Sequence, residues 1–286
     1  MSGVDLRPLS LGEILDRAFS LYRKNFVLFI GISAIPQLLS LAVNLVTLMF
    51  RTPVSISLTP STPPDFSRLL PHGQDLVLGL LAGIVAVVTL QLSQGGTVLA
   101  VSDLYLGRST TIEASLRHAW EAFGTLFGLL VLSGLAILGG TILCVIPGIY
   151  LTCRWWVCVP VALIEKRGAR ESLRRSFELT RGSAGRAFLI ILLYFVLSLG
   201  VGLVLGSPAG LLLILNAKDP GMLRLVNALT QITSSISTIL ISPILLIATS
   251  VYYYDLRVRK EAFDLQFMMD PNSRSIPGTG DVSSIS

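Results

Sequence analysis

Arg154 has the most unusual surroundings of any ionisable residue in this sequence. It lies inside an apolar stretch, 149–165, directly before two tryptophans. An arginine at the centre of a membrane helix costs about 2.5–3.5 kcal/mol, and less if its side chain reaches the interface. We place it on the outer half of its span, where it either snorkels with a structural role or binds a substrate. An outer-leaflet phosphate could pair with it, and the remaining candidate partners are neutral side chains: Asn44, Gln91, Gln94 and Asn216.

The residue types that usually carry catalysis are sparse and scattered. His72 and His118 are the only histidines, and no HExxH or GxSxG motif occurs. The three cysteines, Cys144, Cys153 and Cys158, lie in or beside apolar stretches with no metal-ligand spacing. The sequence therefore predicts no catalytic residue, no metal site and no cofactor. We expect a protein that is not an enzyme; an intramembrane enzyme is a distant third reading.

Six long apolar stretches must position these residues. They cover 26–50, 76–101, 123–145, 149–165, 187–215 and 226–254, and they contain no Asp or Glu before Glu165. About 20 apolar residues cross a bilayer as a helix, and lipid offers backbone groups no other partner. Charged residues make up 14% of the chain, against about 25% in soluble domains. The sequence predicts an all-α polytopic membrane protein with six transmembrane helices.

Lysine and arginine are distributed unevenly between the loops. With six spans, 17 of the 22 fall on the side of both termini and four on the other, while Arg154 lies within a span. Positive residues near spans stay in the cytoplasm. We therefore expect a cytoplasmic (inner) membrane protein with cytoplasmic N and C termini. The net charge of +5 indicates attraction to anionic lipid, and we expect no nucleic-acid partner.

A short amphipathic helix is predicted before the first, third and fifth spans. Phe19, Trp120 and Phe177 occupy equivalent positions in the three helices. Ser10 with Glu13, and Thr110 with Glu113, have capping-box spacing. The single membrane domain, 1–267, then divides into three parallel two-helix units, 8–105, 109–166 and 167–260. The likeness between the units would also be explained by convergence, because each hairpin needs an amphipathic helix at its start. A Pro-rich external loop is expected at 51–75 and a disordered tail at 268–286.

Two functions remain open on this reading. In the first, the three short helices lie at the cytoplasmic interface, where Arg17, Arg117, Arg174 and Arg175 contact anionic headgroups and the three aligned aromatic residues act as anchors. Such a module would bind lipid or a membrane protein partner, although the helices could instead only brace the spans. In the second, the chain is a transporter or channel for a small solute or lipid, with the polar site of Arg154, Asn44, Gln91 and Gln94 lining the path.

Four segments carry a resemblance to a known family. They are RPLSLGEILDRAFSLYRKNF at 7–26, VIPGIY at 145–150 followed by Arg154 and Trp155, ESLRRSFELTRG at 171–182, and YYYDLRVRKE at 252–261. Together they resemble the membrane domain attached to some bacterial glycerophosphodiester phosphodiesterases, and its stand-alone relatives, over most of 5–267. The resemblance implies a six-span bacterial inner-membrane protein. The family's phosphodiesterase activity belongs to a separate soluble barrel, and no matching catalytic residues occur in this sequence.

Overall fold

The computed structural model describes residues 9–50, 73–215 and 220–269, and all regular structure in these ranges is helical. Asn216, most of the predicted loop 51–75 and the predicted tail from residue 270 lie outside the described residues. In chain order the helices are α1 (Leu11–Lys24), α2 (Phe26–Phe50), α3 (Gly73–Tyr105), α4 (Ile112–Glu121), α5 (Phe123–Leu143), α6 (Val145–Arg154), α7 (Cys158–Ile164), α8 (Ala169–Leu179), α9 (Ala184–Leu215) and α10 (Pro220–Met269).

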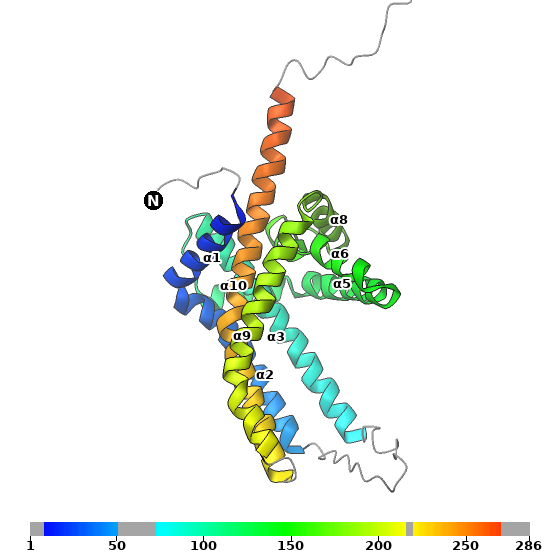
Figure 1. The fold of residues 1–286 in the computed structure, drawn as a ribbon. Helices are drawn as coiled ribbons and strands as arrows, with labels where there is room; N and C mark the ends of the chain where they lie inside the picture. The colour runs from blue at the N-terminus through cyan, green and yellow to red at the C-terminus, as the bar shows by residue number, and fades with distance from the viewer. Residues whose placement is uncertain (1–8, 51–72, 216–219, 270–286) are drawn as a thin grey trace, which may run out of the picture.

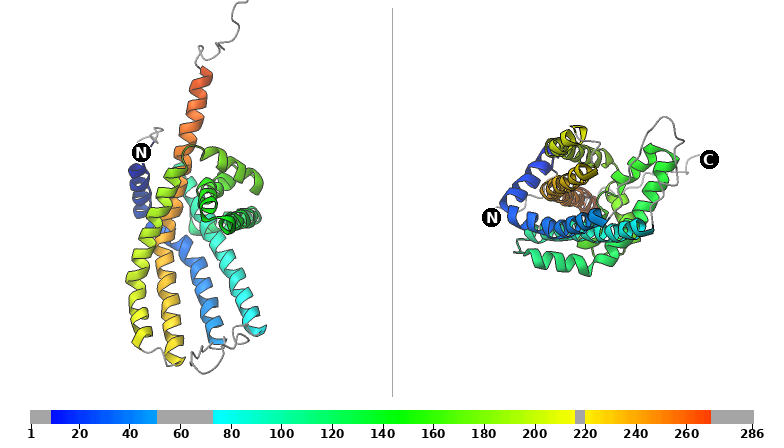
Figure 2. Two further views of the ribbon diagram at one scale, coloured as in Figure 1. Left: turned by 45° about the vertical axis from the view of Figure 1, so that its right-hand side comes forward. Right: turned by 90° about the horizontal axis from the view of Figure 1, so that it is seen from below.

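The long helices α2, α3, α9 and α10 run side by side along one axis (Figures 1 and 2). Helix α10 is central, since it contacts α2, α3 and α9 as well as the short helices α1, α7 and α8. Six segments of the described chain are long and apolar enough to cross a membrane, and they coincide with the six predicted stretches. The prediction of an all-α polytopic membrane protein is thereby confirmed at the level of its helices.

The hairpin of α5 and α6 has a different direction from the other long helices. Figure 2 shows both helices crosswise to the axis of α2, α3, α9 and α10. Its tip projects away from the bundle, so that Ile142, Leu143 and Ile146 are 77%, 87% and 74% exposed. An apolar tip with this exposure is typical of a surface that lipid or another protein covers.

The fourth apolar stretch is not one continuous helix. It divides into α6 and α7, and the chain leaves helical geometry between Trp155 and Val157. Pro160 explains the position of the break, because its ring lacks an N–H and clashes with the carbonyl four residues earlier, that of Trp156. The turn between α5 and α6 is very short. Only Cys144 is extended (φ −168°, ψ 143°), and Pro147 and Gly148 lie in the first turn of α6.

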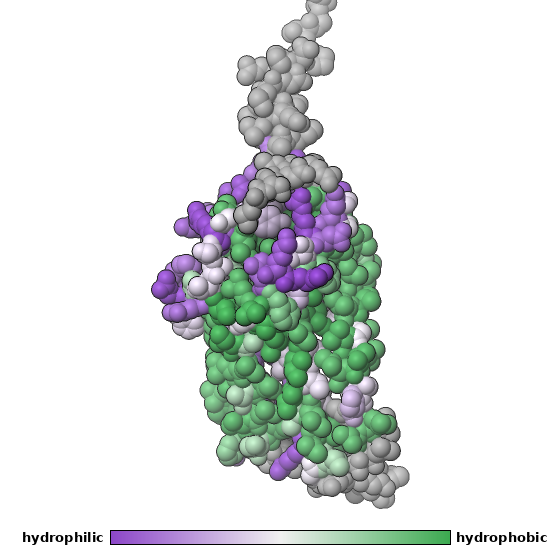
Figure 3. Space-filling view, turned by 90° about the vertical axis from the view of Figure 1, so that its left-hand side faces the viewer, coloured by the Kyte–Doolittle hydropathy of each residue, from purple (hydrophilic) through white to green (hydrophobic). Residues whose placement is uncertain are grey.

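Polar residues gather at one end of the bundle, which we call the polar end. It holds α1, α8 and the C-terminal part of α10, and in Figure 3 it forms a hydrophilic cap above a continuous apolar belt. The buried core lies just beneath this cap, where Tyr252, Tyr253 and Leu256 of α10 are completely enclosed. A polar cap on an apolar belt is the surface expected of a helical bundle seated in a bilayer.

The starts of the short helices agree only in part with their predicted caps. Ser10 and Glu13 form the predicted capping box, with Ser10 N donating to Glu13 Oε2 at 2.7 Å and Glu13 N donating to Ser10 Oγ at 3.3 Å. The cap of α4 is one residue later than predicted. Thr111 Oγ1 accepts from Ala114 N, while Thr110 Oγ1 lies 3.2 Å from Ser115 Oγ.

Gly96 allows α3 to approach α2 and α4 closely. A Cβ atom added there would lie 2.9 Å from Ile32 Cγ2 and 3.3 Å from Leu116 Cδ2. We expect Gly96→Val to lower the free energy of unfolding in mixed micelles by about 1–3 kcal/mol, because overpacked side chains must leave their preferred rotamers. Gly83→Val is the control: it adds the same side chain to the same helix, where no atom lies within 4 Å. Equal losses in the two variants would contradict this packing argument.

Candidate functional site

Three consecutive tyrosines on α10 connect it to the surrounding helices at the polar end. Tyr252 Oη donates to a backbone carbonyl in the α8–α9 turn at 2.8 Å, and Tyr253 Oη donates to Glu165 Oε1 at 3.0 Å. Tyr254 Oη donates to Ser102 Oγ of α3 at 3.1 Å. Buried tyrosine hydroxyls require such partners. Helix α10 is therefore the element against which the other polar-end segments are positioned.

Asp255 follows directly and anchors the start of the described chain. Its side chain is fully buried and accepts from Leu9 N at 2.7 Å and from Arg259 Nε at 2.8 Å, while Arg186 Nη1 lies 3.7 Å away. Arg259 also donates to the carbonyl of Leu9 at 2.6 Å. One carboxylate thus joins the segment before α1 to α9 and α10, and its charge is balanced by two guanidinium groups.

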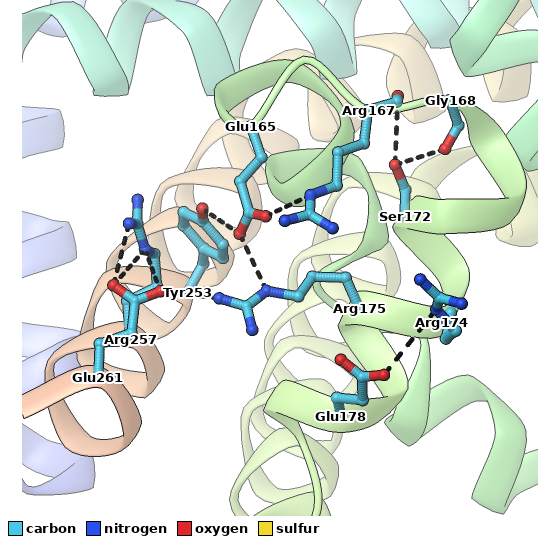
Figure 4. Close-up of polar contacts among 10 residues, drawn as sticks. All are labelled: Glu165, Arg167, Gly168, Ser172, Arg174, Arg175, Glu178, Tyr253, Arg257 and Glu261. Atoms are coloured by element: carbon cyan, nitrogen blue, oxygen red, sulfur yellow. Dashed lines mark hydrogen bonds and ion pairs between the residues drawn. The ribbon is translucent and has the colours of Figure 1, made fainter. Parts of the chain in front are cut away.

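A second ion-pair network joins the end of α7 to α8 and α10 (Figure 4). Glu165, only 10% exposed, accepts from Arg167 at 2.8 Å and from Arg175 at 3.4 Å. Arg175 Nη2 also contacts Glu261 at 2.7 Å, and Arg257 pairs with the same carboxylate at 2.9 Å. The network holds α8 against α10 with charges that satisfy one another.

Arg154 differs from these arginines because it has no carboxylate within 4 Å among the described residues. It is 4% exposed, its Nε has no hydrogen-bond partner, and its guanidinium carbon lies 3.7 Å from the ring centre of Phe177 and 5.8 Å from that of Tyr150. A cation–π contact contributes about 2 kcal/mol at best. Burying an ion costs several kcal/mol. The aromatic contacts alone therefore leave the Arg154 charge under-compensated.

Three further cations lie on or beside α8, the helix that holds the Arg154 carbonyl. The charges of Arg154, Arg175 and Arg181 all act on the Lys260 ammonium. Lys260 Nζ donates to the last-turn carbonyl of Glu178 in α8, where the helix dipole favours a cation. Two carboxylates pair with Arg175, and the Glu178 carboxylate attracts Lys260, whereas no described carboxylate lies within 4 Å of Arg154 or Arg181. The junction of α6, α8 and α10 therefore carries a local excess of positive charge.

The expected position of Arg154 on the outer half of its span is wrong. Its carbonyl accepts from Ser176 Oγ at 3.0 Å and from Thr180 Oγ1 at 2.9 Å, which fixes it to α8 at the polar end. The physical reason is the break before α7 together with the crosswise course of α6, which ends the helix beside α8. The spacing of residues along a span taken as continuous could not indicate that Arg154 lies beside α8.

The predicted headgroup contacts lie in different environments. Arg117 and Arg174 are exposed, and Arg174 has only a loose contact of 3.9 Å with Glu178. Arg17 is half-buried and bonds to Tyr105, and Arg175 belongs to the network described above. The predicted anchors Phe19, Trp120 and Phe177 are 44%, 58% and 37% exposed. Whether any of these residues meets lipid stays a prediction.

The predicted intramembrane polar site is not one cluster. Asn44 donates to the carbonyl of Ser40 within its own helix. Gln91 Nε2 donates to the carbonyl of Leu126 at 2.7 Å, and Gln91 and Gln94 line a cavity of about 250 Å³ beside Trp155. Arg154 lies outside that cavity. The structure thus brings together the two glutamines only.

A larger cavity, of about 640 Å³, opens where α3, α4 and α7 meet. Its wall contains both signs of charge, with Arg108, His118 and Lys166 on one hand and Asp103 and Glu121 on the other. Lys166 adopts a positive φ of 51°, a conformation that is uncommon outside glycine. Among the described residues, no three His, Cys, Asp or Glu side chains are grouped closely enough to hold a metal ion.

The sequence reasoning missed Asp255, Glu165 and Lys260 as organising residues. A signal was present, because two of them are carboxylates at the ends of apolar stretches that otherwise contain none. Carboxylates in such positions need cationic partners. Which arginines provide them depends on contacts between residues that are far apart in the sequence, such as Leu9 and Asp255.

Comparison with known proteins gives one family match. The model described as "Membrane domain of glycerophosphoryl diester phosphodiesterase" matches residues 129–276. The matched region includes Arg154, the ion-pair network and the tyrosine stretch of α10. No curated protein and no solved structure gave a significant match.

Proposed function

Because this chain belongs to the family of the membrane domain of glycerophosphoryl diester phosphodiesterase, we propose that it is a membrane module that binds anionic lipid and has no catalytic chemistry of its own. The observation that carries the proposal is the polar end. It combines exposed arginines with exposed aromatic side chains on α1 and α8, next to a continuous apolar belt, and α4 adds Arg117 and Trp120. This is the composition of a surface that meets phosphate headgroups.

The orientation follows from the same charges. The polar end faces the cytoplasm of a bacterial inner membrane, because the Lys and Arg excess lies there. The hairpins α2–α3 and α9–α10 each follow one short helix and run along one axis, which supports one orientation for these two units, with α1 and α8 at the interface. The α5–α6 hairpin also follows a short helix, α4, but lies crosswise to them. A membrane protein partner could use the same surface.

The proposal predicts that anionic lipid is enriched around the protein. In discs extracted from a mixed bilayer, mass spectrometry of retained lipids should detect phosphatidylglycerol above its bulk fraction. Reversing two exposed charges together, Arg117→Glu and Arg174→Glu, should reduce the enrichment several-fold, because each reversal replaces an attraction of about 1 kcal/mol by a repulsion. Arg224→Glu makes the same change on an exposed residue near the start of α10, at the far end of the bundle, and should leave the enrichment unchanged. Enrichment that is equal in all variants would remove the lipid role.

The cavity of about 250 Å³ beside Gln91 and Gln94 favours a second candidate, a transporter or channel for a small solute or lipid. Its wall is mostly apolar, with a few polar groups, as in sites for small ligands. Gln91 already donates to a carbonyl of α5, and this bond between α3 and α5 favours a structural role for Gln91 over a role in transport. A solute flux in proteoliposomes that Gln94→Leu abolishes would favour transport over the first proposal.

A further inference from the structure

The charge of Arg154 requires a counter-charge that the described protein does not provide. Its guanidinium is almost completely buried under Phe177 and Tyr150, and its Nε is unpaired. No carboxylate of the described chain lies within 4 Å. Buried charges in proteins are paired with an opposite charge or bind a ligand that carries one. Arg154 therefore indicates a place where an anion belongs.

The neighbouring cations indicate which anion fits. Arg181 follows α8 directly, and Lys260 on α10 lies within the Coulomb range of both Arg154 and Arg181. These three cations lie around the last turn of α8, where the Glu178 carboxylate attracts Lys260, whereas Arg175 is taken up by Glu165 and Glu261. A carboxylate offers only two acceptor oxygens to these three cations. A phosphate or phosphodiester has several acceptor oxygens and suits a guanidinium well.

The backbone around these residues is fixed in place before any ligand binds. Two buried hydroxyls, those of Ser176 and Thr180, hold the carbonyl of Arg154. After Arg181, Gly182 takes a positive φ of 81°, the usual conformation after a helix C-terminus, which turns the chain away from α8. Arg154 and the residues that end α8 are thus preorganised, which lowers the entropic cost of binding.

We propose that Arg154, Arg181 and Lys260 form a binding site for one phosphate group at the junction of α6, α8 and α10. The site rests on the proposed lipid function, and it names the residues that bind the phosphate. It differs from the exposed pair Arg117 and Arg174 because Arg154 is buried and Lys260 is half-buried, while Arg181 is exposed. The phosphate can belong to an anionic lipid headgroup or to a free phosphate ion.

The test is a titration of thermal unfolding in neutral detergent. The full chain is titrated with phosphatidylglycerol, with zwitterionic phosphatidylcholine and with inorganic phosphate. We expect phosphatidylglycerol to raise the midpoint of unfolding, and Arg154→Gln and Lys260→Gln each to weaken this response at least tenfold in concentration. Arg170→Gln removes an exposed charge from the same helix α8 and should keep the wild-type response. Because Arg154→Gln alters a buried residue, Lys260→Gln provides the second, partly exposed position.

The three arms separate the possible outcomes. A response to phosphatidylglycerol alone identifies a lipid phosphate, and a response to inorganic phosphate that depends on Arg154 identifies a free anion. Equal responses of the wild type, Arg154→Gln and Lys260→Gln would overturn the site, while the enrichment experiment with Arg117 and Arg174 could still support the lipid function. If the wild type responds to none of the three compounds, the site is refuted directly.

Discussion

Replacing Asp255 with alanine is expected to lower the free energy of unfolding by about 3 kcal/mol, the largest effect on stability that we predict. The carboxylate is fully buried, and it accepts from the backbone of Leu9 and from Arg259 while facing Arg186. Its loss leaves the Leu9 N–H without an acceptor and two guanidinium groups without a counter-charge. A group left unsatisfied costs its full desolvation penalty, which exceeds what the bond itself contributed.

Chemical unfolding in mixed micelles measures this loss, and hydrogen exchange at the Leu9 amide localises it. We expect the amide to exchange faster in Asp255→Ala, because the segment before α1 loses its attachment to α10. Glu178→Ala is the matched control, since Glu178 also pairs with an arginine four positions away in a helix but is 60% exposed at 3.9 Å. Exposed pairs contribute about 0–1 kcal/mol. Similar losses for the two variants would show that Asp255 does not have its assigned role.

The second large effect concerns the position of the α5–α6 hairpin in the membrane. We expect Cys144, at its tip, to be unreactive toward a membrane-impermeant maleimide added to either side of sealed vesicles. The hairpin lies crosswise to the four long helices, and the residues around its tip are apolar and exposed (Figure 2). The turn is short, because Cys144 N donates to the carbonyl of Gly140 and α6 begins at the next residue. We therefore expect four of the six candidate spans to cross the bilayer and the hairpin to enter it without crossing.

Cys144 is suited to this experiment because the other two cysteines, Cys153 and Cys158, are buried. The thiol should become reactive when detergent replaces the membrane, and Ser109→Cys, an exposed position between α3 and α4, should be labelled from one side only. Labelling of Cys144 from the side opposite to position 109 would mean that α5 and the α6–α7 segment cross the bilayer. Either result keeps both termini on one side, since the hairpin returns the chain to the side from which it started.

Several features of this protein depend only on local sequence. Apolar runs of sufficient length specify helices in lipid wherever they occur, so all six stretches appear as helices. The capping box of Ser10 and Glu13 also forms as predicted, because its bonds join residues three positions apart. Gly148 lies in the first turn of α6, where an added Cβ atom would collide with Thr141 of α5. A residue without a side chain is therefore needed there for α5 and α6 to pack closely.

The tertiary structure alone decided the direction of the second hairpin and the surroundings of Arg154. Helix length and hydropathy do not specify tilt, which depends on packing against neighbouring helices. The break before Pro160 ends α6 at Arg154. The packing of α6 against its neighbours then places Arg154 over the ring of Phe177 and near the charge of Lys260. Long-range polar contacts are decided in the same way, because they depend on distance in space: the Asp255 carboxylate accepts from Leu9 N, 246 positions away, and faces Arg186 of α9.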